Sequence, residues 1–424
     1  MAMTATKRKK ASILRALRAV LYLSLLPLVV LFFISKWHNS NSQVSQVSLP
    51  DVQTPPNKGS NLTVWEILSN DESVSRFAGI VGKLPDIVRG LSAPQAQFTV
   101  YAPVNEAFDS FYFPPDPPPF FGLFLAGYHM GPGPVSPVRL RSAGTVSSFV
   151  NGDIFFTYKQ RISIQQNHDE ITFNHEAKYL PTDGALSSAM NGFVHHIDGV
   201  LGLPNSTAHV LRTRPHLSKL REGFACTRLA ESIYDTNLHV SQTLFAPTDV
   251  AFDRLGKKAT KFLFSRWGRP YLRTLLKYHV VANQTLFSDM YWPHNGSDLV
   301  DFHKMRETDS HKFRLPTLLS NNYLTVESRK LRGRWHLRVV PSSDSRKSDE
   351  KEVVEVSVPD ILTMDGVVHL VDAFILPPGP SPKPNVSWMS RLVAMFWHQD
   401  QSVEDLVDRL EPHIEEPEMS ALAP

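Results

Sequence analysis

The sequence predicts an α+β protein that contains two copies of one domain. Three segments occur twice, in the same order, along its 424 residues. QFTVYAPVNEAFDSF at 97–111 is matched by QTLFAPTDVAFDRL at 242–255, and AGYHM at 126–130 is matched by LKYHV at 276–280. MNGFVHHIDGVLGLP at 190–204 is matched within VPDILTMDGVVHLVDAFILPP at 358–378. Chance does not order three motifs twice, so we expect homologous domains at residues 58–206 and 208–379.

The first segment of each copy predicts a strand followed by a helix. FTVYAP alternates apolar with small or polar residues, which is typical of a half-buried strand over residues 98–103. Pro103 and Pro247 then end the ladder of hydrogen bonds. Asn105 and Asp249 follow where a helix needs an N-cap, with Thr248 as an alternative cap in the second copy. We therefore expect a strand-to-helix corner in both domains.

The last segment predicts a buried strand that ends at prolines. Residues 367–376 are mostly β-branched or large, and the glycine before them indicates a close backbone approach. His369 and Asp372 are three residues apart, as are His195 and Asp198, so on a strand they point to opposite faces. Neither pair forms a local dyad. We interpret both histidines as structural, hydrogen-bonded groups rather than general bases.

Composition and charge narrow the class of protein. The hydrophobic share of 42% is that of a globular chain. The formal net charge is +3, but seven cations and no acid fall within residues 1–40, which leaves about −4 for the rest. Because the basic character belongs to the N-terminus, we expect no nucleic-acid partner. Cys226 is the only cysteine, so each domain is held together by its core without an internal disulfide.

The N-terminus predicts a membrane anchor. A basic stretch at 1–18 precedes residues 19–34, which carry no charge, and we place a transmembrane helix at 19–36 and a linker at 37–57. A cleavable signal peptide and a mitochondrial presequence begin similarly, but bulky and charged residues occupy the place of a small-residue cleavage site. With the cations on the cytosolic side, the single-pass type II chain presents its domains to a lumen or the cell exterior.

Five Asn-x-Ser/Thr sequons follow the predicted anchor. They are Asn61, Asn205, Asn283, Asn295 and Asn385. Such sequons are glycosylated on the lumenal or outer side of a membrane, so their placement agrees with the predicted topology.

The duplicated segments resemble the signature boxes of fasciclin-like domains. TVYAPVNEAF and TLFAPTDVAF resemble the first box, NGFVHHIDGVLGLP and DGVVHLVDAFILPP resemble the second, and a Tyr-His motif lies between them. Tyr101 and Val104 stand where the family usually has Phe and Thr. The resemblance implies a compact α+β domain, a twisted wedge of mostly antiparallel strands with helices packed at one side. It also implies a binding or adhesion module that lacks catalysis and cofactors.

The resemblance further implies candidate contacts with a partner. In some animal members, a Tyr-His pair and an Asp-Ile pair just before the second box are proposed receptor contacts. Tyr278-His279 and Asp360-Ile361 match these pairs. The first copy keeps Tyr-His at 128–129 but has Leu-Ser at 186–187, so we expect any such contact in the second copy. The alternatives are a turn or helix cap at Asp360 and a packing role for the Tyr-His pair.

Three further segments lie outside the repeated pattern. FPPDPPPFFG at 113–122 predicts a stiff surface loop. WHLRVV and KEVVEVSV predict two strands joined by a solvated loop, whose nearby cations either meet an acidic polysaccharide or lipid or blunt a sheet edge. Residues 380–424 predict a linker and a helical tail, in which Val403, Leu406, Val407 and Leu410 share one face.

The motifs favour binding over catalysis. The sequence has no GxSxG, HExxH, CxxC or phosphate-binding glycine loop, so we assign no catalytic, cofactor or metal residues. We expect a non-enzymatic adhesion or binding protein that presents two fasciclin-like domains and binds extracellular matrix, cell-wall carbohydrate or a protein. Its layout resembles that of fungal two-repeat members, some of which are associated with the vacuole, so we expect it at the cell surface or the vacuole membrane. The alternative is a vacuolar or endoplasmic reticulum membrane protein that organises membrane or lipid.

Overall fold

The computed structural model describes residues 61–113, 120–150, 160–167, 170–182, 187–234, 241–292, 300–301, 310–341, 353–378 and 403–414. The predicted anchor at 19–36, the prolines at 114–119, Asn295 and Asn385 lie outside these ranges. Within them, no helix has both the length and the apolar character needed to cross a membrane.

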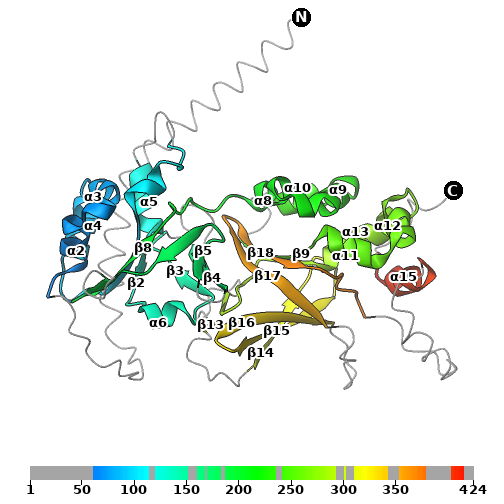
Figure 1. Cartoon of the computed structure of the whole chain (residues 1–424). Coiled ribbons are helices and arrows are strands. Elements are labelled where there is room, and N and C mark those ends of the chain that lie inside the picture. The colour runs from blue at the N-terminus through cyan, green and yellow to red at the C-terminus, as the bar shows by residue number, and fades with distance from the viewer. Residues whose placement is uncertain are drawn as a thin grey trace, which may run out of the picture. The chain divides into compact units, whose positions relative to one another are not determined.

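The first repeat combines short helices with one sheet (Figure 1). Its helices are α2 (Val64–Asn70), α3 (Ser75–Val81), α4 (Pro85–Leu91), α5 (Phe121–Tyr128) and α6 (Pro137–Leu140), with short turns η2 (Glu72–Val74) and η3 (Asn105–Phe108). Its strands are β1 (Phe98–Pro103), β2 (Met130–Pro132), β3 (Thr145–Ser147), β4 (Arg161–Asn167), β5 (Glu170–Phe173), β6 (Ala177–Leu180), β7 (Ser188–Ala189) and β8 (Gly192–Ile197). The strands pair in the order β2-β1-β8-β6-β5-β4-β3, with β7 beside β8.

The second repeat has the same plan with longer helices and strands. Its helices are α8 (Thr207–Thr213), α9 (Ser218–Cys226), α10 (Ala230–Tyr234), α11 (Asp249–Leu255), α12 (Lys257–Phe264) and α13 (Arg269–Tyr278), with a turn η4 (Pro215–Leu217). The main sheet runs β10 (Val280–Ala282), β9 (Gln242–Pro247), β18 (Gly366–Val371), β17 (Val354–Thr363), β16 (Arg334–Pro341), β15 (Tyr323–Leu331) and β14 (Ser310–Pro316). A small sheet contains β11 (Thr285–Leu286), β12 (Met290–Trp292) and β13 (Val300–Asp301).

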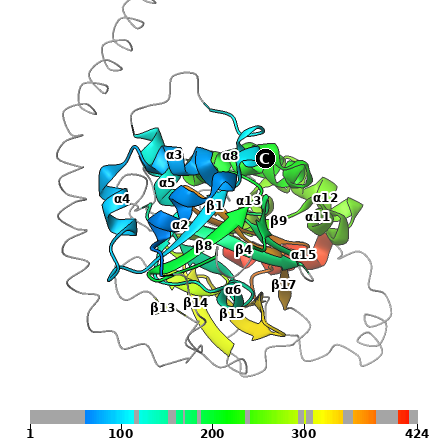
Figure 2. The same ribbon diagram turned by 60° about the vertical axis from the view of Figure 1, so that its left-hand side comes forward.

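The duplicated segments form the middle of each sheet. The first box supplies β1 or β9 and the closing phrase supplies β8 or β18, and these pairs are parallel, whereas the other described pairs are antiparallel. Figure 2 shows β1 beside β8, and Figure 1 shows β9 beside β18. Both predicted strands and the mostly antiparallel α+β class are therefore confirmed.

The prediction of a half-buried first strand was wrong, because β1 and β9 are buried along their whole length. Alternate residues of β1 enter different cores: Val100 and Ala102 pack with α2 to α5, and Tyr101 packs with β4 and β5. In β9, Leu244 and Phe245 separate in the same way. A strand with a core on each face needs no polar side, so the small residues of the box reflect tight packing.

The predicted caps serve neighbouring helices. The Asn105 side chain accepts a hydrogen bond from the backbone N–H of Arg76 in the first turn of α3, at 3.0 Å. Asp249 accepts from the N–H of Lys219 in the first turn of α9, at 2.8 Å. Thr248 is the N-cap residue of α11, but its hydroxyl donates to Asp372 instead. The polar residue of the first box therefore joins two helices in each repeat.

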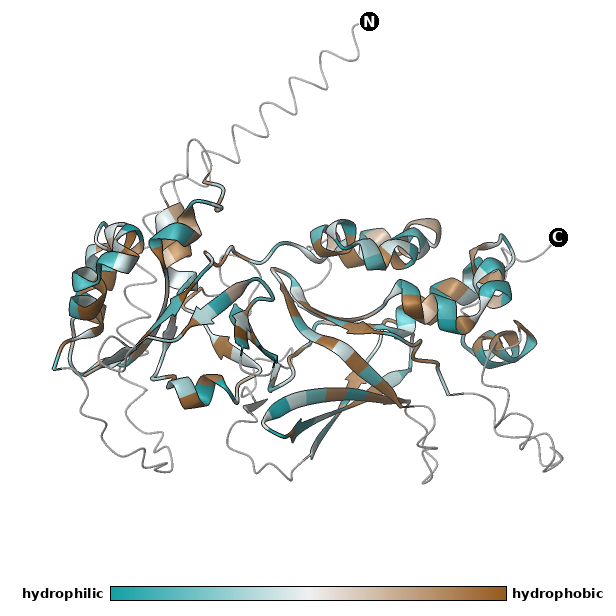
Figure 3. Ribbon diagram, viewed as in Figure 1, coloured by the Kyte–Doolittle hydropathy of each residue, from teal (hydrophilic) through white to brown (hydrophobic). Residues whose placement is uncertain are grey.

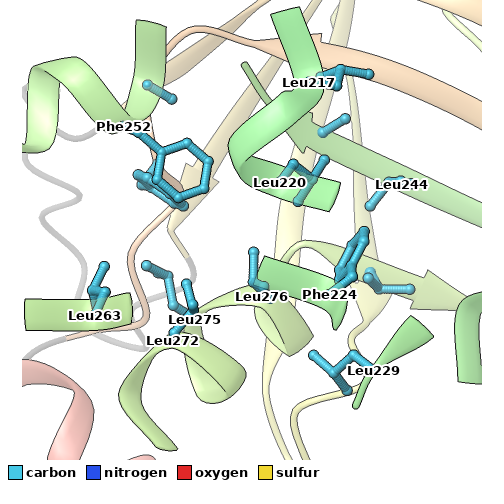
Figure 4. Close-up of a cluster of buried hydrophobic side chains, with 14 of the residues drawn as sticks. Leu217, Leu220, Phe224, Leu229, Leu244, Phe252, Leu263, Leu272, Leu275 and Leu276 are labelled. Atoms are coloured by element: carbon cyan, nitrogen blue, oxygen red, sulfur yellow. The ribbon is translucent and has the colours of Figure 1, made fainter. Parts of the chain in front are cut away.

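The largest core of the second repeat lies between its helices and one face of its main sheet. Figure 4 shows leucines of α13 (Leu272, Leu275, Leu276) near Phe224 of α9 and Leu244 of β9. Helix α9 buries Leu220, Gly223 and Phe224, and α13 is buried along most of its length; in Figure 3 the helices of this repeat carry both hydrophobic and hydrophilic residues. The amphipathic pattern therefore positions the helices without any disulfide.

The predicted tail helix is α15 (Val403–Leu410), followed by a turn η7 (Glu411–His413). Leu406 and Leu410 are buried in the core formed by α12 and α13. Arg409 Nε donates to the carbonyl of Pro377 at 2.5 Å, which joins the tail to the end of the closing phrase. The described part of the tail, residues 403–414, therefore packs as part of the second repeat.

Candidate functional site: the duplicated motifs and the contact between the repeats

The Tyr-His histidines join two distant segments inside each repeat. His129 Nδ1 donates to the carbonyl of Leu125 at 2.8 Å, and its Nε2 accepts from the N–H of Leu201 at 2.9 Å. In the second repeat, His279 donates to Leu275 at 2.8 Å and accepts from Ile375 at 3.0 Å. Both side chains are fully buried. Each histidine therefore fixes the chain after the closing strand to the last turn of a helix.

The tyrosines of this motif also bond to the backbone. The hydroxyl of Tyr128 donates to the carbonyl of Arg161 at 2.9 Å, and that of Tyr278 donates to the carbonyl of Tyr323 at 3.1 Å. Both rings are fully buried. The same bond forms in both repeats, so the motif is a duplicated structural brace.

The closing-phrase histidines are structural hydrogen-bond donors, as predicted. His195 Nε2 donates to the carbonyl of Val135, and His369 Nε2 donates to that of Leu286, both at 2.7 Å. Asp198 instead accepts from the N–H of Lys178 at 2.5 Å, and Asp372 accepts from the Thr248 hydroxyl at 2.7 Å. Neither His-Asp pair is a dyad.

Burial keeps these four histidines neutral. It lowers the pKa of His129, His195, His279 and His369 to about 4, and hydrogen bonding to a backbone carbonyl opposes this only in part. A neutral imidazole with its donor and acceptor both satisfied has no free atom with which to abstract a proton. This holds for three of the four; Nδ1 of His195 has no hydrogen-bond partner among the described residues.

Asp360 is buried, and its backbone adopts a left-handed conformation. Its φ is +58°, which turns its N–H toward His369 Nδ1, at 3.1 Å. Its carboxylate accepts from the N–H of Ser288 at 2.8 Å and also from the Ser288 hydroxyl. Burial, with the nearby charge of Asp289 second, raises the pKa of Asp360 to about 7. The residue thus completes the bonding of the closing-phrase histidine.

The four predicted partner contacts are all interior. Tyr278 and His279 are 0% exposed, Asp360 is 2% exposed and Ile361 is 3% exposed. A partner cannot contact side chains that the core covers, so this correction assigns them to packing and hydrogen bonding. For Tyr278 and His279 the signal was in the sequence, because a motif repeated in both domains indicates a shared structural need, whereas Asp360-Ile361 occurs in the second copy alone and carried no such signal.

The described sequons differ in exposure. Asn61 and Asn205 are exposed, whereas Asn283 is partly buried and its backbone N–H donates to Ser241 at 2.7 Å. Attachment of a glycan requires an accessible side chain, so Asn61 and Asn205 are the better-placed acceptors. Among the residues that the structure describes, no group of three His, Cys, Asp or Glu side chains is placed to hold a metal ion.

A buried carboxylate of the second repeat binds the backbone of the first. Asp289 accepts from the N–H groups of Gly144 and Thr145, at 3.0 and 2.6 Å, and from the Thr145 hydroxyl at 2.5 Å. Asp289 and Thr145 are both fully buried. A Cβ atom on Gly144 would lie 2.3 Å from the Ser288 hydroxyl, so the glycine permits this close approach.

Further bonds extend the contact between the repeats. Trp335 Nε1 donates to the carbonyl of Ser142 at 3.1 Å, and Gln160 Nε2 donates to that of Met364 at 3.3 Å. The guanidinium of Arg161 lies 5.7 Å from the centre of the Phe287 ring. Sequence reasoning missed this contact, because Asp289 and Gly144 lie in segments that the repeats do not share.

We expect Asp289→Ala to separate the unfolding of the two repeats. The change leaves two buried N–H groups and one hydroxyl without their acceptor, which costs on the order of 3 kcal/mol. Calorimetry of the full chain in detergent should show one transition for the wild type and an earlier, broader or split transition for the variant. Asp253→Ala is the matched control, because that side chain is 72% exposed. An unchanged transition in Asp289→Ala would contradict the role of this contact.

Comparison with known proteins identifies the family of this chain. The fasciclin domain model matches residues 72–204 and 215–377. Aurofusarin biosynthesis cluster protein S of Gibberella zeae is 60% identical over 410 residues, which covers 97% of this chain and 100% of that protein. Stabilin-2 of Rattus norvegicus is 30% identical over 142 residues, 30% of this chain and 10% of that protein.

A solved structure also matches. A FAS1 domain pair from the insect cell adhesion molecule fasciclin I covers 72% of this chain and 97% of that chain, with a TM-score of 0.36 and 19% identity. The family assignment depends on the two matched segments and on the duplicated boxes described above. This chain belongs to the fasciclin family and contains two fasciclin domains in tandem.

Proposed function

We propose that the chain is a non-catalytic binding protein that serves a biosynthesis cluster from the lumenal or outer side of a membrane. The observation that carries this proposal is the similarity to aurofusarin biosynthesis cluster protein S, 60% identical across 97% of this chain. A relative that matches both repeats and the tail shares the whole architecture rather than one module. The partner is then a protein or small molecule of that cluster, rather than extracellular matrix or cell-wall carbohydrate.

The hydrogen bonding of the motifs supports binding over catalysis. His129, His279 and His369 use both ring nitrogens on backbone groups, and all three are fully buried. The repeated residues therefore maintain the fold and leave recognition to surfaces that differ between the repeats. The basic start of the chain and the exposed Asn61 and Asn205 support a lumenal or exterior side.

Gene deletion in the source organism tests the role in a cluster. We expect the deletion strain to lose one metabolite and accumulate its precursor, with normal growth and adhesion, and the full-length gene should restore the product. Lost adhesion with an unchanged metabolite profile, measured by liquid chromatography and mass spectrometry, would favour an adhesive role and contradict the proposal.

Incubation of the purified chain with the accumulated precursor separates binding from catalysis. We expect the precursor to be recovered unchanged. Turnover that depends on the purified chain would show an enzyme, and the non-catalytic part of the proposal would then be wrong.

A further inference from the structure

A buried hydroxyl in the first repeat has no hydrogen-bond partner. Tyr101 of β1 is 0% exposed, and its hydroxyl bonds to no group among the described residues. An unsatisfied hydroxyl in a core is costly, and most buried polar atoms have a partner. The hydroxyl therefore needs a partner from outside the described residues, which is either water or a bound group.

The fold itself does not need this hydroxyl. The second repeat has Phe245 at the equivalent place: Tyr101 pairs in register with His195, and Phe245 pairs with His369. Each ring stacks on its histidine, at 5.8 Å in the first repeat and 5.4 Å in the second. Each backbone N–H donates to the carbonyl of the Tyr-His histidine. The two rings thus share their strand register, their stacking on a histidine and their backbone bond, and only Tyr101 carries a hydroxyl.

The cavity that Tyr101 lines is polar. Its volume is about 60 Å³, several times the roughly 10–15 Å³ that one water requires. Arg139, Arg161 and Thr145 contribute to its wall, and Met290 of the second repeat also lines it. No acidic side chain lines this cavity, although Asp289 accepts hydrogen bonds from Thr145 of its wall and the charge of Arg161 also acts on the buried Asp360.

Both arginines are arranged to attract negative charge. Arg161 is 5% exposed and is held by its Nε bond to the Thr145 hydroxyl at 2.6 Å and its Nη1 bond to the Ser147 hydroxyl at 3.0 Å. Arg139 is exposed, and its side chain makes no hydrogen bond or ion pair among the described residues. Burial raises the pKa of Tyr101, and the charges of Arg139 and then Arg161 oppose that rise, so both cations act at the hydroxyl.

We propose that Tyr101, Arg139 and Arg161 form a binding site for a compact oxyanion, such as phosphate, sulfate or the carboxylate of a small acid. The planar guanidinium fork of Arg139 matches oxyanion geometry, Arg161 adds positive charge at the wall, and the neutral phenol supplies a further donor. Because Met290 lies on the wall, a bound oxyanion contacts both repeats. The second repeat cannot form the same site, since Phe245 has no donor.

Isothermal titration calorimetry of the full chain in detergent tests this site. Phosphate, sulfate and acetate are titrated separately, with chloride at matched ionic strength as the control. We expect saturable binding of one oxyanion per chain. Arg139→Gln should weaken that binding about tenfold, because it removes a charge-assisted bond. Arg141→Gln makes the same charge change two residues away, outside the cavity wall, and should leave it unchanged.

Tyr101→Phe gives the second test without a risk to folding, because it introduces the residue that the second repeat already has. We expect weaker oxyanion binding and, in buffer without oxyanion, a melting temperature equal to or above that of the wild type. Binding of tetrahedral anions, of acetate, or of both supports the site and identifies its ligand. The absence of saturable binding, equal effects of Arg139→Gln and Arg141→Gln, or unchanged binding in Tyr101→Phe would each overturn the proposal.

Discussion

Between pH 6.5 and pH 4 the chain is expected to lose most of its free energy of unfolding. His129, His195, His279 and His369 have a pKa of about 4 in the folded state, against 6.5 as the ordinary value. In that window the unfolded chain binds more protons than the folded chain, so acid favours unfolding. Each histidine contributes at most about 3 kcal/mol. Four such contributions are comparable with the total stability of roughly 5–15 kcal/mol.

One buried acid acts in the opposite direction. The pKa of Asp360 is raised from 3.8 to about 7, so between these values the folded state holds the proton that the unfolded state has lost. Acidification through this window therefore stabilises the fold at Asp360. A single carboxyl group offsets only part of the effect of four imidazoles, so the net result remains acid unfolding.

Denaturant unfolding of the full chain at a series of pH values measures this dependence. His279→Gln should reduce the slope against pH, because one titrating group is removed, and should also destabilise the chain at pH 7. His216→Gln is the control, since that side chain is exposed, and its slope should equal the wild-type slope. A free energy of unfolding that stays constant from pH 7 to pH 4 would show that the histidines are accessible in the native state.

Gly366→Ala is expected to abolish folding of the second repeat, at a cost of about 4 kcal/mol or more. A Cβ atom at this position would lie 2.0 Å from the backbone oxygen of Gln242, and the φ of +150° is one that L side chains rarely adopt. The neighbour is backbone at the start of β9, so it cannot move aside without breaking the parallel pair. Gly192 in the first repeat has the same geometry, with φ +152° and 1.9 Å to the oxygen of Phe98.

Alanine substitutions at two other glycines distinguish the cost of a steric clash from the cost of a positive φ. Gly79→Ala meets nothing within 4 Å in α3 and should be neutral or slightly stabilising. Gly333→Ala also meets nothing within 4 Å but has φ +79°, so it should cost only about 1–2 kcal/mol. Circular dichroism and denaturant unfolding of the three variants measure the order of their losses in free energy of unfolding. A stable, folded Gly366→Ala chain would mean that β9 and β18 do not approach as described.

The duplicated part of the fold was predictable because repetition marks what both domains need. The strands, the structural role of His369 and the apolar face of the tail helix each followed from local pattern. The prediction that failed was that the motif residues are exposed at the surface. Tyr278 and Asp360 match residues proposed as contacts elsewhere, yet the Tyr278 hydroxyl donates to the carbonyl of Tyr323 and the Asp360 carboxylate accepts from the N–H and hydroxyl of Ser288, all inside the protein.

The features that occur in only one repeat could not be predicted from the sequence. Asp289 bonds to Thr145 from 144 residues away, and no local pattern marks either residue. Asn105 caps a helix 29 residues earlier in the chain, because the corner places it beside α3. Tyr101 did carry a sequence signal, since it stands where the second copy has Phe245 and where the family usually has Phe. Similarities between the repeats are thus a good guide to folding, whereas a difference such as Asp360 can also be buried and structural.

Hydroxyl-radical footprinting of the native full chain tests most directly whether the Tyr-His motif is interior. Tyr278 is 0% exposed and Tyr112 is 76% exposed, so mass spectrometry of the two residues compares like with like. We predict rapid oxidation of Tyr112 and protection of Tyr278 until the chain is unfolded by denaturant. Oxidation of Tyr278 in the native chain at the rate of Tyr112 would contradict its place in the core and return the motif to the surface as a contact for a partner.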